Sequence, residues 1–147
     1  MQKNFDHKLY EGKIIEKWEE SGAFEAKADS GKKPYTIVLP PPNASGRMHT
    51  GNVLMIAIED ILIRWHRMRG EEVLWIPGTD HAGTETQITF ERELKRQGRS
   101  RFNYNRQDFY EEVWKFVQSN KALVEGQIKQ MGASVDWSRN KFTLDAD

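Results

Sequence analysis

Apolar residues at the start of this chain of 147 residues follow helical spacing within a mostly charged segment. The segment ends at Ser21-Gly22, which predicts an amphipathic helix with a glycine stop. A polar, turn-rich linker over residues 27–34 separates it from the rest of the chain. We therefore expect a helical leader over residues 1–33 that packs one face on a larger body, through Leu9, Ile14, Ile15 and Trp18.

Two short apolar runs and a longer periodic segment follow the linker. Residues 35–39 (YTIVL) predict a buried strand, because the prolines that come next cannot donate to a sheet ladder. Over residues 51–69 apolar side chains recur at three-and-four spacing up to Gly70, which predicts a largely buried helix. Residues 73–76 (VLWI) predict a second strand. This order predicts a βαβ crossover with a parallel sheet, and hence the α/β class.

The remainder predicts two more helices, over residues 85–97 and 108–131, each followed by a glycine.

Lys and Arg (22) balance Asp and Glu (22), so bulk charge does not favour a nucleic-acid or membrane surface. The absence of cysteine excludes disulfides, thiolate zinc sites and thiol nucleophiles. The histidines lack metal-ligand spacing, so no protein-bound metal is expected. Without an apolar signal-peptide core or a membrane-spanning run, a cytoplasmic location is expected.

The segment PNASGRMHTGN, between the first strand and its helix, is the first place where chemistry is expected. A helix start presents N–H groups and a positive dipole end to an anion, and Gly46 and Gly51 allow a phosphate to approach the backbone. His49 and Asn52 project on one side of this start, and both can donate hydrogen bonds to phosphate oxygens. The pattern suits adenylyl transfer, although Pro and Gly between a strand and a helix also form ordinary turns.

A second candidate site is PGTDHAG, after the second strand. Asp80 would lie at the same sheet edge as His49, because ligands bind parallel sheets at the carboxyl ends of their strands. A carboxylate there can hold an ammonium group, which suits an amino acid beside a nucleotide. The same string is also ordinary turn and N-cap chemistry, and His81 is expected either to contact substrate or to cap the next helix.

Four strings together resemble the amino-terminal part of class I valyl-tRNA synthetases: PPPNASGRMHTGN, DILIRWHRMRG, VLWIPGTDHAGTETQ and GASVDWSRNKFTLD. The resemblance covers nearly the whole chain, and PGTDHAG points to the valyl branch. It implies that residues 34–147 form the first half of a Rossmann-like parallel-sheet nucleotide-binding domain, behind the N-terminal helical leader. It also implies ATP-dependent activation of valine to valyl-adenylate, with Mg²⁺ and release of pyrophosphate, followed by transfer to tRNA(Val).

The resemblance also implies roles for single residues on the ATP side. His49 and Asn52 occupy the two histidine places of the HIGH signature and would be catalytic, by stabilising charge on the transferring phosphoryl group. With Gly46 and Gly51 they would form the ATP-binding site, where magnesium is held through the phosphates. Asn52 departs from the signature's last histidine, because it keeps a donor but cannot carry an imidazolium charge.

On the amino-acid side, the resemblance implies that Pro41, Pro42 and Asn43 lie beside valine, while Asp80 receives its α-ammonium. The string TETQ stands where the family usually has IATQ, so Glu85 brings a carboxylate near the pocket.

The family's editing domain, its KMSKS-bearing second half and its anticodon-binding region have no counterpart in the sequence. We therefore expect a first half truncated before the editing insertion, with little or no activity by itself. Half of a sheet would expose apolar faces and strand edges, which predicts association, poor solubility or partial order.

Two alternatives are open. One is a small HxGH-type nucleotidyltransferase, which uses the same phosphate cradle. The other is a non-catalytic half that needs a partner polypeptide, with Trp114 and Trp137 either at its surface or anchored in the core.

Overall fold

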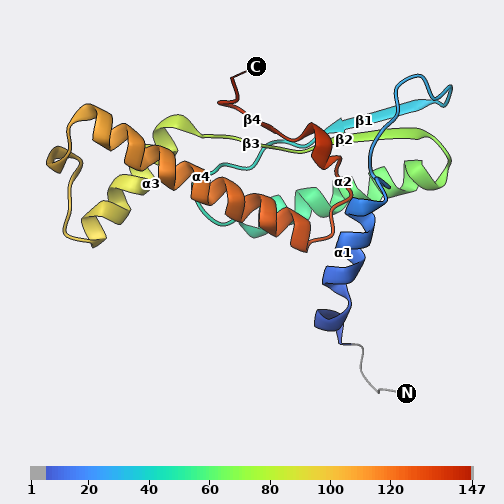
Figure 1. Ribbon diagram of the computed structural model, residues 1–147, viewed down its shortest axis with the longest axis horizontal. Coiled ribbons are helices and arrows are strands. Elements are labelled where there is room, and N and C mark those ends of the chain that lie inside the picture. The colour runs from blue at the N-terminus through green and yellow to red at the C-terminus, as the bar shows by residue number, and fades with distance from the viewer. Residues whose placement is uncertain (1–5, 147) are drawn as a thin grey trace.

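The computed structural model describes residues 6–146, so the first five residues of the predicted leader and Asp147 lie outside the described residues. The helices and strands, in chain order, are α1 (Glu11–Glu20), β1 (Pro34–Val38), α2 (Thr50–Met68), β2 (Glu72–Ile76), β3 (Gly78–Thr79), α3 (Gly83–Arg96), α4 (Arg106–Gln130) and β4 (Lys141–Phe142). Short 3-10 turns lie at His7–Leu9, Arg101–Asn103 and Trp137–Arg139. Every predicted helix and strand is present, with slightly shifted ends (Figure 1).

The strands are parallel, as predicted. β1 and β2 pair in a register that sets Tyr35 opposite Val73 and Val38 opposite Ile76, with α2 as the crossover between them. Beyond Pro77 the chain continues as β3, which pairs in parallel with β4. Sequence reasoning missed β3 and β4, because strands this short show no period.

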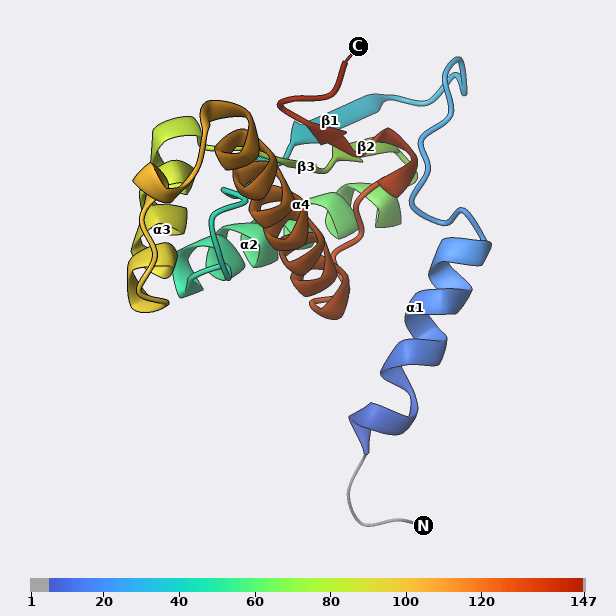
Figure 2. The same cartoon turned by 60° about the vertical axis from the view of Figure 1, so that its left-hand side comes forward.

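The core lies between the β1–β2 sheet, α2 and α4, which crosses over α2 in Figure 2. Its buried side chains are Leu39, Ile56, Ile63, Val73, Trp75, Val124, Ile128, Ala133 and Val135. The Trp75 indole N–H donates to Glu59 Oε2 at 3.1 Å. Burial raises the pKa of the Glu59 carboxyl, and the hydrogen bond from Trp75 opposes that shift.

The expectation that α2 is largely buried is wrong. Ile56 and Ile63 are its only buried residues, whereas its other face is open and exposes a row of large apolar side chains: Val53, Leu54, Ile58, Ile61, Leu62, Trp65 and Met68. β1 is not a buried strand either, because exposed and half-buried residues alternate along it and Val38 is 64% exposed. The cause is the same for both, since no described segment covers these surfaces. The predicted exposure of apolar faces is therefore confirmed.

Within the described residues, the leader docks through the last turn of α1 and the segment that follows it. α1 has no buried residue and projects from the body in both views (Figures 1 and 2), so the expected packing of its whole apolar face is wrong. The guanidinium of Arg64 lies 5.2 Å from the centre of the Trp18 ring, and that of Arg67 lies 5.0 Å from the centre of the Phe24 ring. Gly22 adopts a left-handed φ of 60°, which turns the chain between these two aromatic anchors.

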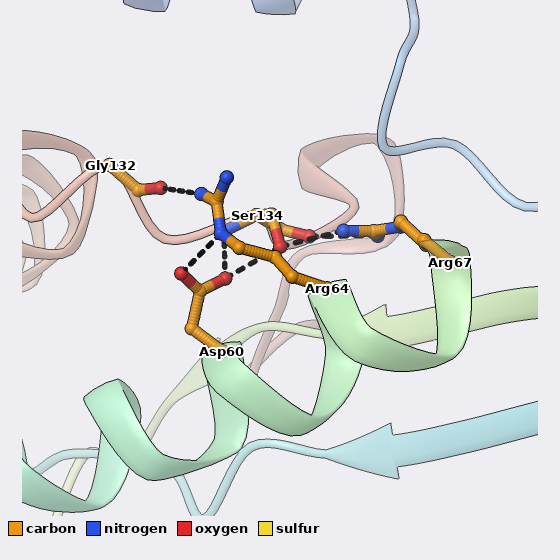
Figure 3. A network of polar contacts seen from close by, with 5 residues as sticks. All are labelled: Asp60, Arg64, Arg67, Gly132 and Ser134. Atoms are coloured by element: carbon orange, nitrogen blue, oxygen red, sulfur yellow. Dashed lines mark hydrogen bonds and ion pairs between the residues drawn. The ribbon is translucent and has the colours of Figure 1, made fainter. Parts of the chain in front are cut away.

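A polar network ties the segment after α4 to α2 (Figure 3). Asp60 Oδ1 accepts hydrogen bonds from the Ser134 backbone N–H at 3.0 Å and from its hydroxyl at 2.6 Å. Arg64 bonds Asp60 Oδ2 and donates to the Gly132 carbonyl, both at 2.7 Å. Arg67 donates to Ser134 Oγ at 2.6 Å and to its carbonyl at 2.9 Å. Burial lowers the pKa of the Arg67 guanidinium, and Asp60 opposes that shift.

The remaining helices form a pair beside this core. Phe90 of α3 contacts Phe109 and Phe116 of α4, with ring centres 5.9 Å and 5.3 Å apart. Trp137 packs against the core, as one of the two open interpretations expected, whereas Trp114 is 36% exposed. No helix in residues 6–146 is long and apolar enough to cross a membrane.

Candidate functional site

The turns that follow β1 and β3 lie side by side at the carboxyl ends of the strands. A parallel bridge joins Asn43 to Asp80. The Asp80 N–H donates to the Pro42 carbonyl at 2.9 Å, and the Ala44 N–H donates to the Asp80 carbonyl at 2.7 Å. Pro42 is buried beneath this bridge, whereas Pro41 is exposed. The two predicted segments, PPPN and PGTDHAG, therefore meet at one edge of the sheet.

His49 is the N-cap of α2 and forms a capping box with Asn52. Its Nδ1 accepts hydrogen bonds from the backbone N–H groups of Gly51 at 3.0 Å and Asn52 at 3.3 Å. These N–H groups are thus occupied, not free for an anion as the helix start suggested. Because Nδ1 acts as an acceptor, the proton of the neutral ring lies on Nε2, which is a donor without a partner in residues 6–146.

The other three residues of the predicted ATP cradle have distinct surroundings. Asn52 accepts the His49 backbone N–H through Oδ1 at 3.3 Å, which leaves its Nδ2 group as a donor. A Cβ on Gly51 would lie 2.8 Å from His49 Cε1, so glycine makes room here for the histidine ring. A Cβ on Gly46 would meet no atom within 4 Å, so the backbone there is open to a ligand.

Asp80 and His81 form a cluster with Thr143, which follows β4. Asp80 Oδ1 accepts hydrogen bonds from the Ala82 N–H at 3.0 Å and from the Thr143 hydroxyl at 3.1 Å. The His81 backbone N–H donates to Thr143 Oγ1 at 2.9 Å, and His81 Nδ1 lies 2.6 Å from the same oxygen. Helix α3 has Ala82 as its N-cap and no side-chain cap, so the expectation that His81 caps it is wrong.

The Glu85 side chain points toward the loop that follows β1. Its Oε2 accepts a hydrogen bond from Asn43 Nδ2 at 2.8 Å, and its Oε1 accepts one from the Ser45 hydroxyl at 3.4 Å. The carboxylate that departs from the family pattern therefore ties the start of α3 to the loop after β1. It occupies the amide donor of Asn43, one of the residues predicted to lie beside valine.

A small apolar cavity of about 180 Å³ opens beside this cluster. It lies between the ends of β1, β2–β3 and β4, and its lining includes Pro41, Pro77, Thr79, Phe142 and Thr143. Of these, the sequence indicated Pro41 as a single residue, and Pro77 and Thr79 as part of the PGTDHAG segment, whereas Phe142 and Thr143 were missed. The cavity is suited to a short aliphatic group, because its lining is almost wholly apolar.

The structure gathers the predicted residues into two groups. One contains Asn43, Asp80 and His81, and the other contains His49, Gly51 and Asn52; no hydrogen bond or ion pair joins the groups within residues 6–146. Thr143 was missed, since only the parallel pairing of β4 with β3 brings it here. No cluster of three potential metal ligands occurs among the described residues.

Comparisons with known proteins bear on this arrangement. Residues 13–147 match the family described as tRNA synthetases class I (I, L, M and V). The valine–tRNA ligase of Geobacter sulfurreducens is 48% identical over 145 residues, which cover 99% of this chain and 16% of that protein. The valine–tRNA ligase of Dehalococcoides mccartyi strain CBDB1 is 45% identical over 144 residues, covering 95% of this chain and 16% of that protein. This chain thus spans about a sixth of the length of these relatives.

A solved structure shares the fold. It is the ternary complex of Agrobacterium radiobacter K84 agnB2 LeuRS with tRNA and LeuAMS, with a TM-score of 0.78 at 22% identity, covering 97% of this chain and 16% of that chain. These findings favour a synthetase over the small nucleotidyltransferase considered above. The family match extends over nearly the whole chain, and this protein therefore belongs to the class I tRNA synthetases.

Proposed function

We propose that this chain is the part of a valine–tRNA ligase in which ATP and valine meet. In the proposed reaction a valine carboxylate oxygen attacks the α-phosphorus of ATP, and the bond from that phosphorus to the pyrophosphate leaving group breaks. The resulting valyl-adenylate would then pass its valyl group to tRNA(Val). The high identity to valine–tRNA ligases over almost the whole chain supports this choice of amino acid.

On the ATP side, the proposal assigns the phosphates to the start of α2. His49 would donate from Nε2–H and Asn52 from Nδ2, and both would act on the charge that develops during transfer. The capped geometry supports this. His49 Nδ1 and Asn52 Oδ1 both accept backbone N–H groups, so the remaining nitrogen of each side chain, Nε2 or Nδ2, is left as a donor. Gly46 and Gly51 would allow close approach of the nucleotide, and Mg²⁺ would arrive with the ATP phosphates.

On the amino-acid side, the proposal assigns the α-ammonium to Asp80 and the isopropyl group to the cavity that Pro41 lines. Asp80 Oδ1 is held by Ala82 and Thr143, whereas Oδ2 makes no hydrogen bond within residues 6–146. The carboxylate side chain is 35% exposed, so a ligand can reach it. This oriented carboxylate beside a small apolar cavity is the observation that carries the proposal. Pro42 and Asn43 complete the loop next to it.

The test is valine-dependent ATP–pyrophosphate exchange by the purified chain, with isoleucine and threonine as competing amino acids and Asn52→Ala as the matched variant. We expect weak exchange with valine that falls further in Asn52→Ala. Calorimetric binding of valine to the same sample gives a second measurement that needs no turnover. A folded sample that binds neither valine nor ATP would contradict the proposal.

The proposal includes the organisation of the protein. Residues 1–33 form a leader, and residues 34–147 form the first half of the catalytic domain, ahead of an editing insertion. The open face of α2 supports a requirement for further polypeptide, because large apolar side chains such as Ile61 and Met68 are 67% and 79% exposed. Association through this face, tRNA(Val) as partner and a cytoplasmic location belong to the same proposal.

A further inference from the structure

In the Asp80–His81–Thr143 cluster, the Thr143 hydroxyl contacts both of the other residues. Thr143 lies more than sixty residues from its partners in sequence, and its hydroxyl contacts three of their groups. These are the His81 backbone N–H, the His81 Nδ1 and the Asp80 Oδ1, at 2.9, 2.6 and 3.1 Å. A hydroxyl has one proton to donate and two lone pairs, so these three contacts use its full capacity.

The direction of each hydrogen bond follows from counting protons. The His81 backbone N–H can only donate, and an ionised Asp80 carboxylate can only accept. Thr143 must therefore donate its single proton to Asp80 Oδ1, or that contact would bring two oxygens together without a proton. The remaining contact, from His81 Nδ1 to Thr143 Oγ1, then requires the proton on Nδ1. The ring of a neutral His81 thus carries its lone pair on Nε2.

We propose that Thr143 is a positioning residue that holds His81 in the Nδ1–H tautomer, so that Nε2 accepts a hydrogen bond from the bound amino acid. This inference rests on the proposed function, because that function supplies the α-ammonium of valine as the hydrogen-bond donor. His81 Nε2 makes no hydrogen bond within the described residues, and the side chain is 37% exposed. The α-ammonium would donate to Asp80 Oδ2 and to His81 Nε2. Both acceptors are oriented by the same hydroxyl.

The tautomer can be measured without any ligand. Long-range ¹⁵N–¹H correlation spectra of the ¹⁵N-labelled chain, at a pH where His81 is neutral, distinguish protonated from unprotonated ring nitrogens. We expect the Nδ1–H form in the unchanged chain and in Thr143→Ser, which keeps the hydroxyl. Thr143→Val is nearly isosteric but has no hydroxyl, so its ring should shift toward a mixture of tautomers. An Nε2–H form in the unchanged chain would overturn the inference.

Valine binding gives the functional test. Thr143→Val should weaken valine binding about tenfold, because one charge-assisted hydrogen bond is lost, and should leave ATP binding unchanged. Thr143→Ser should restore the affinity. Thr36→Val, on the exposed side of β1, is the matched control and should bind valine normally. Equal weakening in Thr143→Ser and Thr143→Val would refute the hydroxyl's role.

The two proposals fail in different ways. If the unchanged chain has the Nδ1–H tautomer but does not bind valine, the proposed function fails while the tautomer assignment stands. If valine binds normally in all variants, the proposed function stands and the role of Thr143 fails.

Discussion

Two polar clusters of this protein differ in how far their hydrogen-bonding groups are used. In the network between α2 and the segment after α4, Asp60 uses both carboxylate oxygens on Arg64 and Ser134, and Ser134 is fully buried (Figure 3). In the cluster after β3, one oxygen of Asp80 and one nitrogen of His81 have no partner within residues 6–146. A cluster with satisfied groups stabilises the fold, whereas one with oriented, unused acceptors at the surface is suited to bind a ligand.

The largest expected effect is loss of stability in the satisfied network. Asp60→Ala would leave the buried Ser134 N–H without its acceptor and remove the carboxylate bound to Arg64 Nε, and should lower the free energy of unfolding by about 2–3 kcal/mol. Urea unfolding of the chain measures this. Glu20→Ala, at the exposed end of α1, is the control and should change stability by less than about 0.5 kcal/mol. Similar losses in both variants would contradict a special role for the network.

The next effect concerns binding at the unsatisfied cluster. Asp80→Ala should weaken valine binding roughly 50-fold, since the ammonium loses its charged acceptor, and should affect ATP much less. Titration calorimetry with each ligand measures the split. Asp80→Asn keeps an oxygen for Ala82 and Thr143 but removes the charge, so its affinity should be intermediate. Equal loss of valine and ATP binding would show that Asp80 only supports the fold.

His49 combines both kinds of role, and two substitutions separate them. His49→Ala should weaken ATP binding about tenfold and cost about 1 kcal/mol of stability, because the outer donor and the helix cap are both lost. Asn is a good N-cap, so His49→Asn should retain stability and still lose ATP affinity. Thermal unfolding with and without ATP measures both quantities. Valine affinity should stay unchanged in both variants, and a large loss would remove His49 from the ATP site.

The smallest effect is a pH dependence at the opposite end of α2. A hydrogen bond from His66 lowers the pKa of Glu71, and one from the Lys27 backbone N–H lowers that of Glu72. A carboxyl whose pKa is lower in the folded protein stabilises the fold above its unfolded value of 4.5, and this contribution is lost as pH falls through the folded value. Unfolding free energy should therefore decrease on acidification below about pH 4.5, and less steeply in Glu71→Gln. An equal slope in that variant would refute the assignment.

The local features of the fold were predictable because they depend on neighbours in sequence. The spacing of apolar residues indicated α2 and α4, and Gly70 and Gly132 follow these helices with left-handed φ angles of 79° and 68°. That the two candidate loops share one sheet edge was also predictable, since parallel strands place their carboxyl ends together; the prediction paired Asp80 with His49, whereas the structure bridges Asp80 to Asn43. By contrast, periodicity could not tell that one apolar face of α2 is open, because burial depends on what lies opposite.

The sequence by itself determined the elements, the parallel βαβ unit and the residues that carry the family resemblance. Only the tertiary structure decided which groups are used: His49 Nδ1 is occupied by its own helix, Glu85 is bound to Asn43, and Thr143 reaches Asp80 across β3 and β4. Periodicity, turns and motifs depend on residues close together in sequence, so they can be recognised from the sequence alone. The capacity of a donor or acceptor to bind a ligand depends on partners distant in sequence, which are brought together only when strands and helices pack.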